Sequence, residues 1–135
     1  MYKNILIPVA SDHDPETERA LDVARRLASD GATLTALTVV EMIPEYIATQ
    51  LPEGQIEKNM KSIEGGLHSA LDAAGDIKVE VVSGHSGRTI LDWAEEHGVD
   101  CIVMASHRPD LSNYFLGSTA SRVVRHAQCA VHVLR

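Results

Sequence analysis

Apolar runs of strand length alternate with helical patterns along this chain, and this alternation limits its possible folds more than any other feature. A helical pattern lies between each run and the next, which predicts parallel strands joined by helical crossovers. The predicted elements, strand and helix in turn, cover residues 2–9, 15–29, 33–40, 53–74, 77–81, 89–97, 101–105, 118–127 and 129–134. We therefore expect an α/β fold built on a doubly wound, five-stranded parallel sheet.

The composition of two of these runs indicates their places in the sheet. Residues 5–7 read Ile-Leu-Ile, as expected of a central strand that is covered on both faces. Residues 77–81 alternate apolar and charged side chains, which favours an edge strand. With the strand order 3-2-1-4-5, the first and fourth strands flank the point where the winding reverses. Residues 8–10 and 104–108 then meet at the carboxyl edge, where open sheets of this kind bind their ligands.

The charge balance and the cysteine count exclude several classes of protein. Twelve Lys and Arg against nineteen Asp and Glu give a formal net charge of −7, which disfavours nucleic acid and anionic membranes as partners. Cys101 and Cys129 lie too far apart for a metal or redox motif, so we expect two reduced thiols. No apolar stretch reaches the ~20 residues of a membrane span. We expect a single domain, residues 1–135, in a soluble cytoplasmic protein.

Residues 101–135 hold the pattern that most favours a binding site. A strand is followed by a polar loop, by Gly117 and Ser118, and by a helix, an arrangement that presents backbone N–H groups to phosphate. Asp110 is the only acid of this segment, whereas its basic residues include His107, Arg108, Arg122, Arg125 and His126. Two simpler interpretations stay open. Ser118 is also a suitable helix cap without any ligand, and Arg122 and Arg125 also suit a solvated basic helix face.

Motifs of catalysis are missing from the sequence. It contains no Gly-x-Ser-x-Gly nucleophile elbow, no Walker-type Gly-Lys-Ser, and no metal-ligand spacing among its seven histidines. We therefore expect no metal site and no catalytic residues, and we predict that the protein is not an enzyme.

Several short motifs resemble the universal stress protein family, and together they span the whole chain. They are Tyr2-Lys-Asn-Ile-Leu-Ile-Pro8, Thr38-Val39, Gly84, Ile102-Val-Met-Ala-Ser-His107, Leu116-Gly-Ser118 and Val124-Arg-His-Ala127. The loop Ser106-His-Arg-Pro-Asp110 is similar to that of short, single-domain members. The resemblance implies a Rossmann-like domain of the adenine nucleotide alpha hydrolase-like type. It also implies a homodimer paired through the last strand and, as in many members, a site for ATP or a related adenine nucleotide.

Carried over to this sequence, the resemblance implies a nucleotide site in which Val39 and Met104 pack against adenine. The other residues of the implied site form one wall or contact the phosphates: Pro8, Val9, Ala10, Ala105, His107, Arg108, Gly117, Ser118 and Thr119.

Two departures from the family's nucleotide motif weaken this expectation. The family has Gly-x-x-Gly, nine residues, then Gly-Ser or Gly-Thr, whereas this chain has Ala105 and Arg108 at the first two glycines and only eight residues before Gly117. Many members also carry an Asp where this chain has Ala10. Losing that charge-assisted hydrogen bond costs about 1.5–3 kcal/mol. In exchange, Arg108 offers a guanidinium to phosphate.

Three functions follow, in order of preference. The first is a homodimeric regulator of the stress response that binds ATP and acts on an unknown protein partner. The second is a protein-interaction module of the same fold that binds no nucleotide and works through the dimer and the irregular residues 41–52. The third is a slow ATPase.

Overall fold

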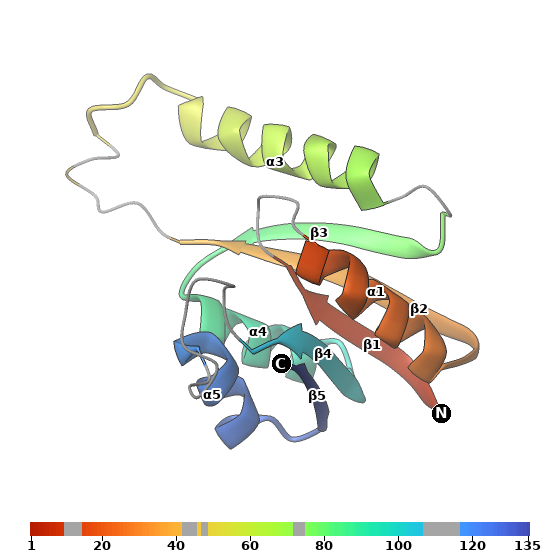
Figure 1. Cartoon of the computed structure of the whole chain (residues 1–135). Helices are drawn as coiled ribbons and strands as arrows, with labels where there is room; N and C mark the ends of the chain where they lie inside the picture. Colours follow the sequence, from red (N-terminus) through yellow and green to blue (C-terminus); the bar gives the residue numbers. More distant parts are fainter. Residues whose placement is uncertain (10–14, 42–45, 47–48, 72–74, 107–116) are drawn as a thin grey trace.

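The computed structural model describes residues 1–9, 15–41, 46, 49–71, 75–106 and 117–135, excluding the side chains of residues 15 and 67–71. The strands and helices alternate as predicted (Figure 1). Their bounds are β1 (Tyr2–Pro8), α1 (Pro15–Leu27), β2 (Ala28–Val40), α3 (Gln55–Leu71), β3 (Ile77–Ser83), α4 (Ser86–Glu96), β4 (Cys101–Ala105), α5 (Ser118–His126) and β5 (Ala130–Leu134). Within the described residues, no helix is both long and apolar enough to cross a membrane.

The five strands form one parallel sheet with the order β3-β2-β1-β4-β5, which confirms the predicted topology. β1 lies at the centre, and residues 5–7 are 0% exposed because helices cover both faces of the sheet. β3 lies at one edge, where Lys78 and Glu80 are exposed between buried apolar neighbours. The alternating pattern of β3 was therefore a correct sign of an edge strand.

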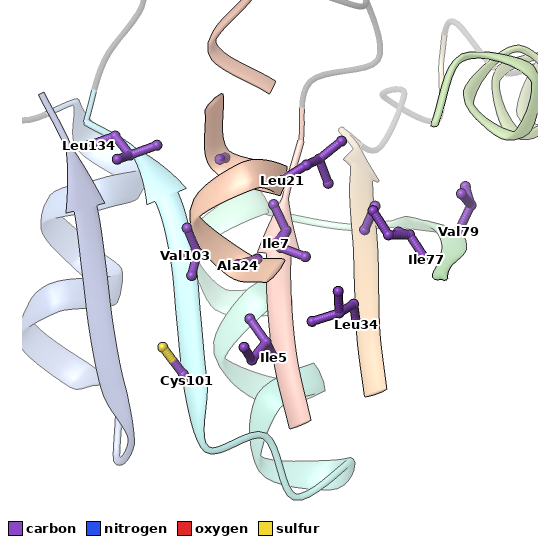
Figure 2. Close-up of a cluster of buried hydrophobic side chains, with 12 residues drawn as sticks. Ile5, Ile7, Leu21, Ala24, Leu34, Ile77, Val79, Cys101, Val103 and Leu134 are labelled. Carbon is purple, nitrogen blue, oxygen red and sulfur yellow. The ribbon is translucent and has the colours of Figure 1, made fainter. Parts of the chain in front are cut away.

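The first of two apolar layers lies between the sheet and helices α1 and α3. Figure 2 shows Ile5 and Val103, from neighbouring strands, on the same side of the sheet as Leu21 and Ala24 of α1. α3 adds the partly buried Ile63 to this layer. α1 therefore covers the middle of the sheet, and α3 packs mainly over β3.

The second apolar layer lies on the opposite face, under α4 and α5. Its buried members come from strands β1, β2 and β4, from both helices and from the connection between α4 and β4: Leu6, Leu37, Ile90, Ala94, Val99, Ile102, Met104, Ala120 and Val123. Helices on both faces of a parallel sheet make this a doubly wound, Rossmann-like fold.

Some predicted boundaries are wrong by a few residues. The first helix ends at Leu27 instead of residue 29, because the chain starts to pair with β1 at Ala28. Gly31, with a φ of +76°, lies where the register between β1 and β2 shifts. α4 begins at Ser86, so part of the predicted turn 84–87 is helical. Residues 42–45 and 47–48 of the predicted irregular segment lie outside the described residues.

One carboxylate joins the starts of β1 and β4 at the amino end of the sheet. Oδ2 and Oδ1 of Asp100 accept hydrogen bonds from the backbone N–H groups of Lys3 (2.8 Å) and Asn4 (3.0 Å). The N–H of Asp100 donates in turn to the carbonyl of Asn4 (3.0 Å). The Asn4 side chain donates to the carbonyl of His97 (2.7 Å). The amino end of the central strand is thus closed by the protein's own groups.

Candidate functional site

The carboxyl ends of β1 and β2 are tied together at Val9, one residue before the undescribed segment 10–14. The N–H of Val9 donates to the carbonyl of Leu37 (2.9 Å). The Thr38 hydroxyl donates to the carbonyl of Val9 (3.2 Å), and Thr38 is 1% exposed. Because both backbone polar groups of Val9 are paired, the direction in which the chain leaves β1 is fixed.

The end of β4 is tied in the same way to the start of α5. The N–H of Ser106 donates to the carbonyl of Leu134 (2.8 Å), and the N–H of Gly117 donates to the carbonyl of Ser106 (2.6 Å). Ser106 itself is buried. Residues 106 and 117 therefore lie side by side although ten residues separate them in sequence. The start of α5 is held at the carboxyl edge of β4.

α5 begins at Ser118, and Gly117 is its N-cap. Gly117 has φ −61° and ψ 159° and, as a glycine, provides no side-chain cap. The simpler interpretation of Ser118 as the cap is therefore wrong, because Ser118 is the first helical residue and is exposed. The first bond within the helix runs from the N–H of Ser121 to the carbonyl of Gly117 (2.9 Å). The N–H groups before Ser121 have no acceptor within the helix.

The first turn of α5 also carries no acidic residue, unlike α1, which has Glu16 and Glu18 there, and α3, which has Glu57. An acid in the first turn offsets the positive end of the helix dipole. In α5 no carboxylate of the first turn offsets this partial positive charge. A helix start of this kind suits an anionic ligand.

The start of α4 lies beside the start of α5. The Ser86 and Thr119 hydroxyl oxygens are 2.9 Å apart in a partly buried hydrogen bond. α4 likewise has no side-chain cap at His85 and no acid in its first turn. Next to Ser86, Gly87 is covered by the side chain of Arg122 from α5. Two helix starts and one guanidinium-bearing side chain thus meet at the carboxyl edge of the sheet.

The structure brings the described members of the predicted site to this edge, from three strands and one helix. Pro8 ends β1, and Ala105 ends β4. Val39 and Met104 belong to the layer under α4 and α5, whereas Val9 packs into the opposite layer. Met104 is only 4% exposed, so the protein itself already covers most of the side chain that was expected to contact adenine.

The remaining predicted site residues divide into two groups. Gly117, Ser118 and Thr119 form the start of α5, as described above. Ala10, His107 and Arg108 lie outside the described residues, so their part in the site remains a prediction.

Three residues of this edge were missed by sequence reasoning. Thr38 was noted only as part of a family motif, yet its hydroxyl fixes Val9. Ser86 and Gly87 were assigned to a turn, yet they form the first turn of α4 and contact α5. The available signal in the sequence was a small residue, Ser86, followed by Gly87 before a helical pattern. This signal does not by itself show which helix packs against these residues.

Both cysteines lie at the other end of the sheet. Cys101 opens β4 and is buried, Cys129 directly precedes β5 and is half-buried, and both are free thiols. Burial raises the pKa of the Cys101 thiol to about 11 and also raises the pKa of the Cys129 thiol. Both are therefore protonated at neutral pH and are poor nucleophiles. In the described part of the chain, no group of three or more His, Cys, Asp or Glu is placed to hold a metal ion.

Comparisons with known proteins place the chain in one family. The model of the universal stress protein family matches residues 1–135. Universal stress protein G of Escherichia coli O157:H7 is 29% identical over 150 residues, and the match covers 100% of both chains. The structure of universal stress protein UspA from Lactobacillus plantarum is 31% identical, with a TM-score of 0.69 and coverage of 99% of this chain and 98% of that one.

Two more distant structures share the fold and hold a nucleotide. One is a universal stress protein in complex with cAMP, with 20% identity, a TM-score of 0.71 and coverage of 99% and 97% of the two chains. The other is the universal stress protein from Archaeoglobus fulgidus in complex with dAMP, with 18% identity, a TM-score of 0.64 and coverage of 99% and 98%. The family model covers the whole length of the sequence, and the relatives match it from end to end, so this chain belongs to the universal stress protein family.

Proposed function

We propose that the protein binds an adenine nucleotide, ATP being the first candidate, at the carboxyl edge of the sheet. The observation that carries this proposal is the start of α5, where the N-cap, Gly117, provides no side-chain acceptor of its own and the first turn of the helix holds no acid. Backbone N–H groups and an uncompensated helix dipole are the features that bind phosphate in other α/β proteins. The phosphates would contact Gly117, Ser118 and the backbone of Thr119.

The choice of an adenine nucleotide rests on the family. Two family members of the same fold hold cAMP and dAMP, which makes the adenosine part the first group to test. In the proposed site Pro8 and Val9 form one wall, Val39 and Met104 lie on the adenine side, and Ala105 lies near the phosphates. Ala10, His107 and Arg108 belong to the same proposal. We propose binding without catalysis, in keeping with a regulator of the stress response.

The test places a carboxylate where the phosphates would bind. Gly117 has a backbone conformation that any residue adopts, and Asp is a favourable N-cap. We therefore expect Gly117→Asp to keep or slightly raise the free energy of unfolding. In titration calorimetry with Mg-ATP, its affinity should fall at least ~100-fold, or about 2.7 kcal/mol, through charge repulsion and competition for the same N–H groups.

The matched control is Gly117→Asn, which has the shape of Asp and caps the helix without a charge. We expect the ATP affinity of this variant to stay within about tenfold of that of the unsubstituted protein. This corresponds to a loss of at most about 1.4 kcal/mol of binding free energy. Undiminished affinity of Gly117→Asp for ATP would reject the proposed phosphate site. No heat from the unsubstituted protein at millimolar ATP would reject nucleotide binding altogether.

We further propose a homodimer paired through β5. The outer edge of β5 pairs with no strand among the described residues, and Ala130 and His132 of this strand are exposed. The opposite edge, β3, exposes the charged Lys78 and Glu80, which are typical protection against edge pairing. An edge strand without such charges is suited to pairing with a second copy. The two free thiols support a cytoplasmic location.

Light scattering at micromolar concentration tests the dimer. Around a two-fold axis, two β5 strands pair antiparallel, so like charges on this strand oppose one another across the pair. We expect the mass of a dimer for the unsubstituted protein and that of a monomer for Ala130→Asp/His132→Asp. The uncharged Ala130→Ser/His132→Ser variant should remain dimeric. A monomer at every concentration of the unsubstituted protein would contradict the proposal.

An interaction module without nucleotide is the second candidate function. Tyr46, from the segment predicted as irregular, is 70% exposed, and Ile56 near the start of α3 is 37% exposed. A partner surface requires such side chains to form one contiguous apolar patch, and this second function predicts that Tyr46 and Ile56 belong to one. Loss of a partner on Tyr46→Ala, together with absent ATP binding by the unsubstituted protein, would favour this function over the first.

A further inference from the structure

The start of α5 is held from the side by Ser86 of α4, a residue that the proposed nucleotide site does not include. Ser86 is the first residue of α4, and Thr119 is the second residue of α5. Their hydroxyl oxygens are 2.9 Å apart, in a partly buried hydrogen bond in which either group can donate. The contact lies within the helical turn whose backbone N–H groups the proposed phosphates would use.

A second contact, one residue further along α4, brings the same two helices close together. A Cβ atom at Gly87 would lie 2.8 Å from Cδ of Arg122 and 3.4 Å from its Cβ and Cγ. The absence of a side chain at Gly87 therefore allows the Arg122 side chain to lie directly on the backbone of α4. Together with the hydroxyl pair, this contact fixes where α5 begins relative to α4.

The hydroxyl pair also determines what Thr119 can offer a ligand. A hydroxyl has one proton to donate, and the Thr119 hydroxyl already shares a hydrogen bond with Ser86. Whichever of the two hydroxyls donates, Thr119 can offer its backbone N–H to phosphate, and the position of that N–H depends on how the helix start is held.

We infer that Ser86 is a positioning residue for the nucleotide site: by holding the Thr119 hydroxyl, it sets the position of the N–H groups at the start of α5 without touching the ligand. This inference rests on the proposed function. A hydrogen bond to phosphate prefers an angle above about 150° and weakens steeply below about 120°, so a displacement of the helix start that tilts these N–H groups away from the phosphate reduces affinity.

A double-mutant cycle measured by Mg-ATP titration calorimetry tests the inference. We expect Ser86→Ala and Thr119→Val each to weaken ATP binding about 5- to 10-fold. Since both remove the same hydrogen bond, the double variant should bind no more weakly than either single variant. Ser86→Thr, which keeps the hydroxyl, should restore the affinity to within about twofold. Ser83→Ala, which removes an exposed hydroxyl from the end of β3, is the matched control and should have no effect.

Two further readouts separate positioning from loss of stability. Urea unfolding of every variant shows whether the fold remains intact at the titration temperature. Amide hydrogen exchange in the nucleotide-free protein should be faster at residues 118–120 in Ser86→Ala, and unchanged in Ser83→Ala.

The outcomes are distinct. If the unsubstituted protein binds ATP and Ser86→Ala binds equally well, the inference fails while the proposed function stands. If Thr119→Val weakens binding and Ser86→Ala does not, Thr119 contacts the nucleotide directly, and the inference fails in a different way. If the unsubstituted protein binds no ATP, the proposed function and the inference fall together.

Discussion

The two ends of the parallel sheet differ in the acceptors that they provide for backbone N–H groups. At the amino end, the N–H groups of Lys3 and Asn4 are satisfied by the carboxylate of Asp100. At the carboxyl end, α4 and α5 begin without a side-chain cap and without an acid in the first turn. Backbone N–H donors are thus paired with a carboxylate at the amino end, whereas at the carboxyl end neither the N-cap residue nor the first turn of α4 or α5 supplies one.

This difference separates residues that hold the fold from residues that can bind a ligand. The amino end also has the ion pair between Arg25, in the last turn of α1, and Asp76, just before β3. At the carboxyl end, the contacts around Thr38, Ser86 and Gly117 fix backbone positions without placing a negative charge at the helix starts. Changes at the amino end should therefore alter stability alone, whereas changes at the carboxyl end should alter affinity.

The largest effect on stability is expected for Asp100→Ala. It removes two charge-assisted hydrogen bonds that join β1 to the start of β4. Because these bonds are partly exposed, we expect the free energy of unfolding to fall by about 2–3 kcal/mol. Urea denaturation measures this loss.

Asp100→Asn is the control for Asp100→Ala, since it keeps one carbonyl acceptor and should lose roughly half as much. ATP affinity should stay within about twofold in both variants, in contrast to Gly117→Asp. If Asp100→Ala weakened ATP binding by a factor of ten or more while the protein remained folded, the two ends would not be independent, and the comparison would be wrong.

A smaller, pH-dependent effect is expected at the Arg25–Asp76 pair. The hydrogen bond from Arg25 Nε to Asp76 Oδ2 (2.9 Å) lowers the pKa of the Asp76 carboxyl. A lowered pKa in the folded state adds stability above the unfolded value of about 3.9, and this stability is lost as the pH falls through the folded value. The two side chains are 33% and 40% exposed, so solvent screening limits the effect to about 0.2–1 kcal/mol.

The measurement compares urea unfolding of the unsubstituted protein and Asp76→Asn between pH 7 and pH 3. We expect a stability difference at pH 7 that shrinks below about pH 4. Asp30→Asn, at an exposed position, serves as the control. A difference that grew as the pH fell would contradict the assigned direction of the pKa shift.

Sequence patterns were sufficient for the sheet but not for the contacts between helices. The apolar run of β1 and the alternating pattern of β3 each reflect how deeply that strand is buried. The central position of β1 and the edge position of β3 in the sheet could therefore be predicted. The ends of helices could not be predicted in the same way. At the end of α1, for example, the pairing of Ala28 with Tyr2 competes with the last turn of the helix. That competition depends on a strand elsewhere in the chain.

The candidate site was predictable only in outline. A Gly-Ser pair before a helical pattern located the start of α5, but the choice of Gly117 over Ser118 as the cap depends on the hydrogen bond that holds Gly117 to Ser106 at the end of β4. The contact of Ser86 with Thr119 joins residues 33 apart in sequence and depends on how two helices pack. Local periodicity carries no information about such a contact.

The hydrogen bonds of Asp100 also constrain the order in which the chain completes its core during synthesis. They join residues 96 and 97 positions apart, and β1 gains its second neighbour only when β4 has been made. Until then the central strand of the sheet is an edge strand, open to pairing with other chains. The last third of the chain therefore does more than supply the helix start for a ligand: it closes the exposed side of β1 and ends the period in which the nascent protein is most prone to aggregate.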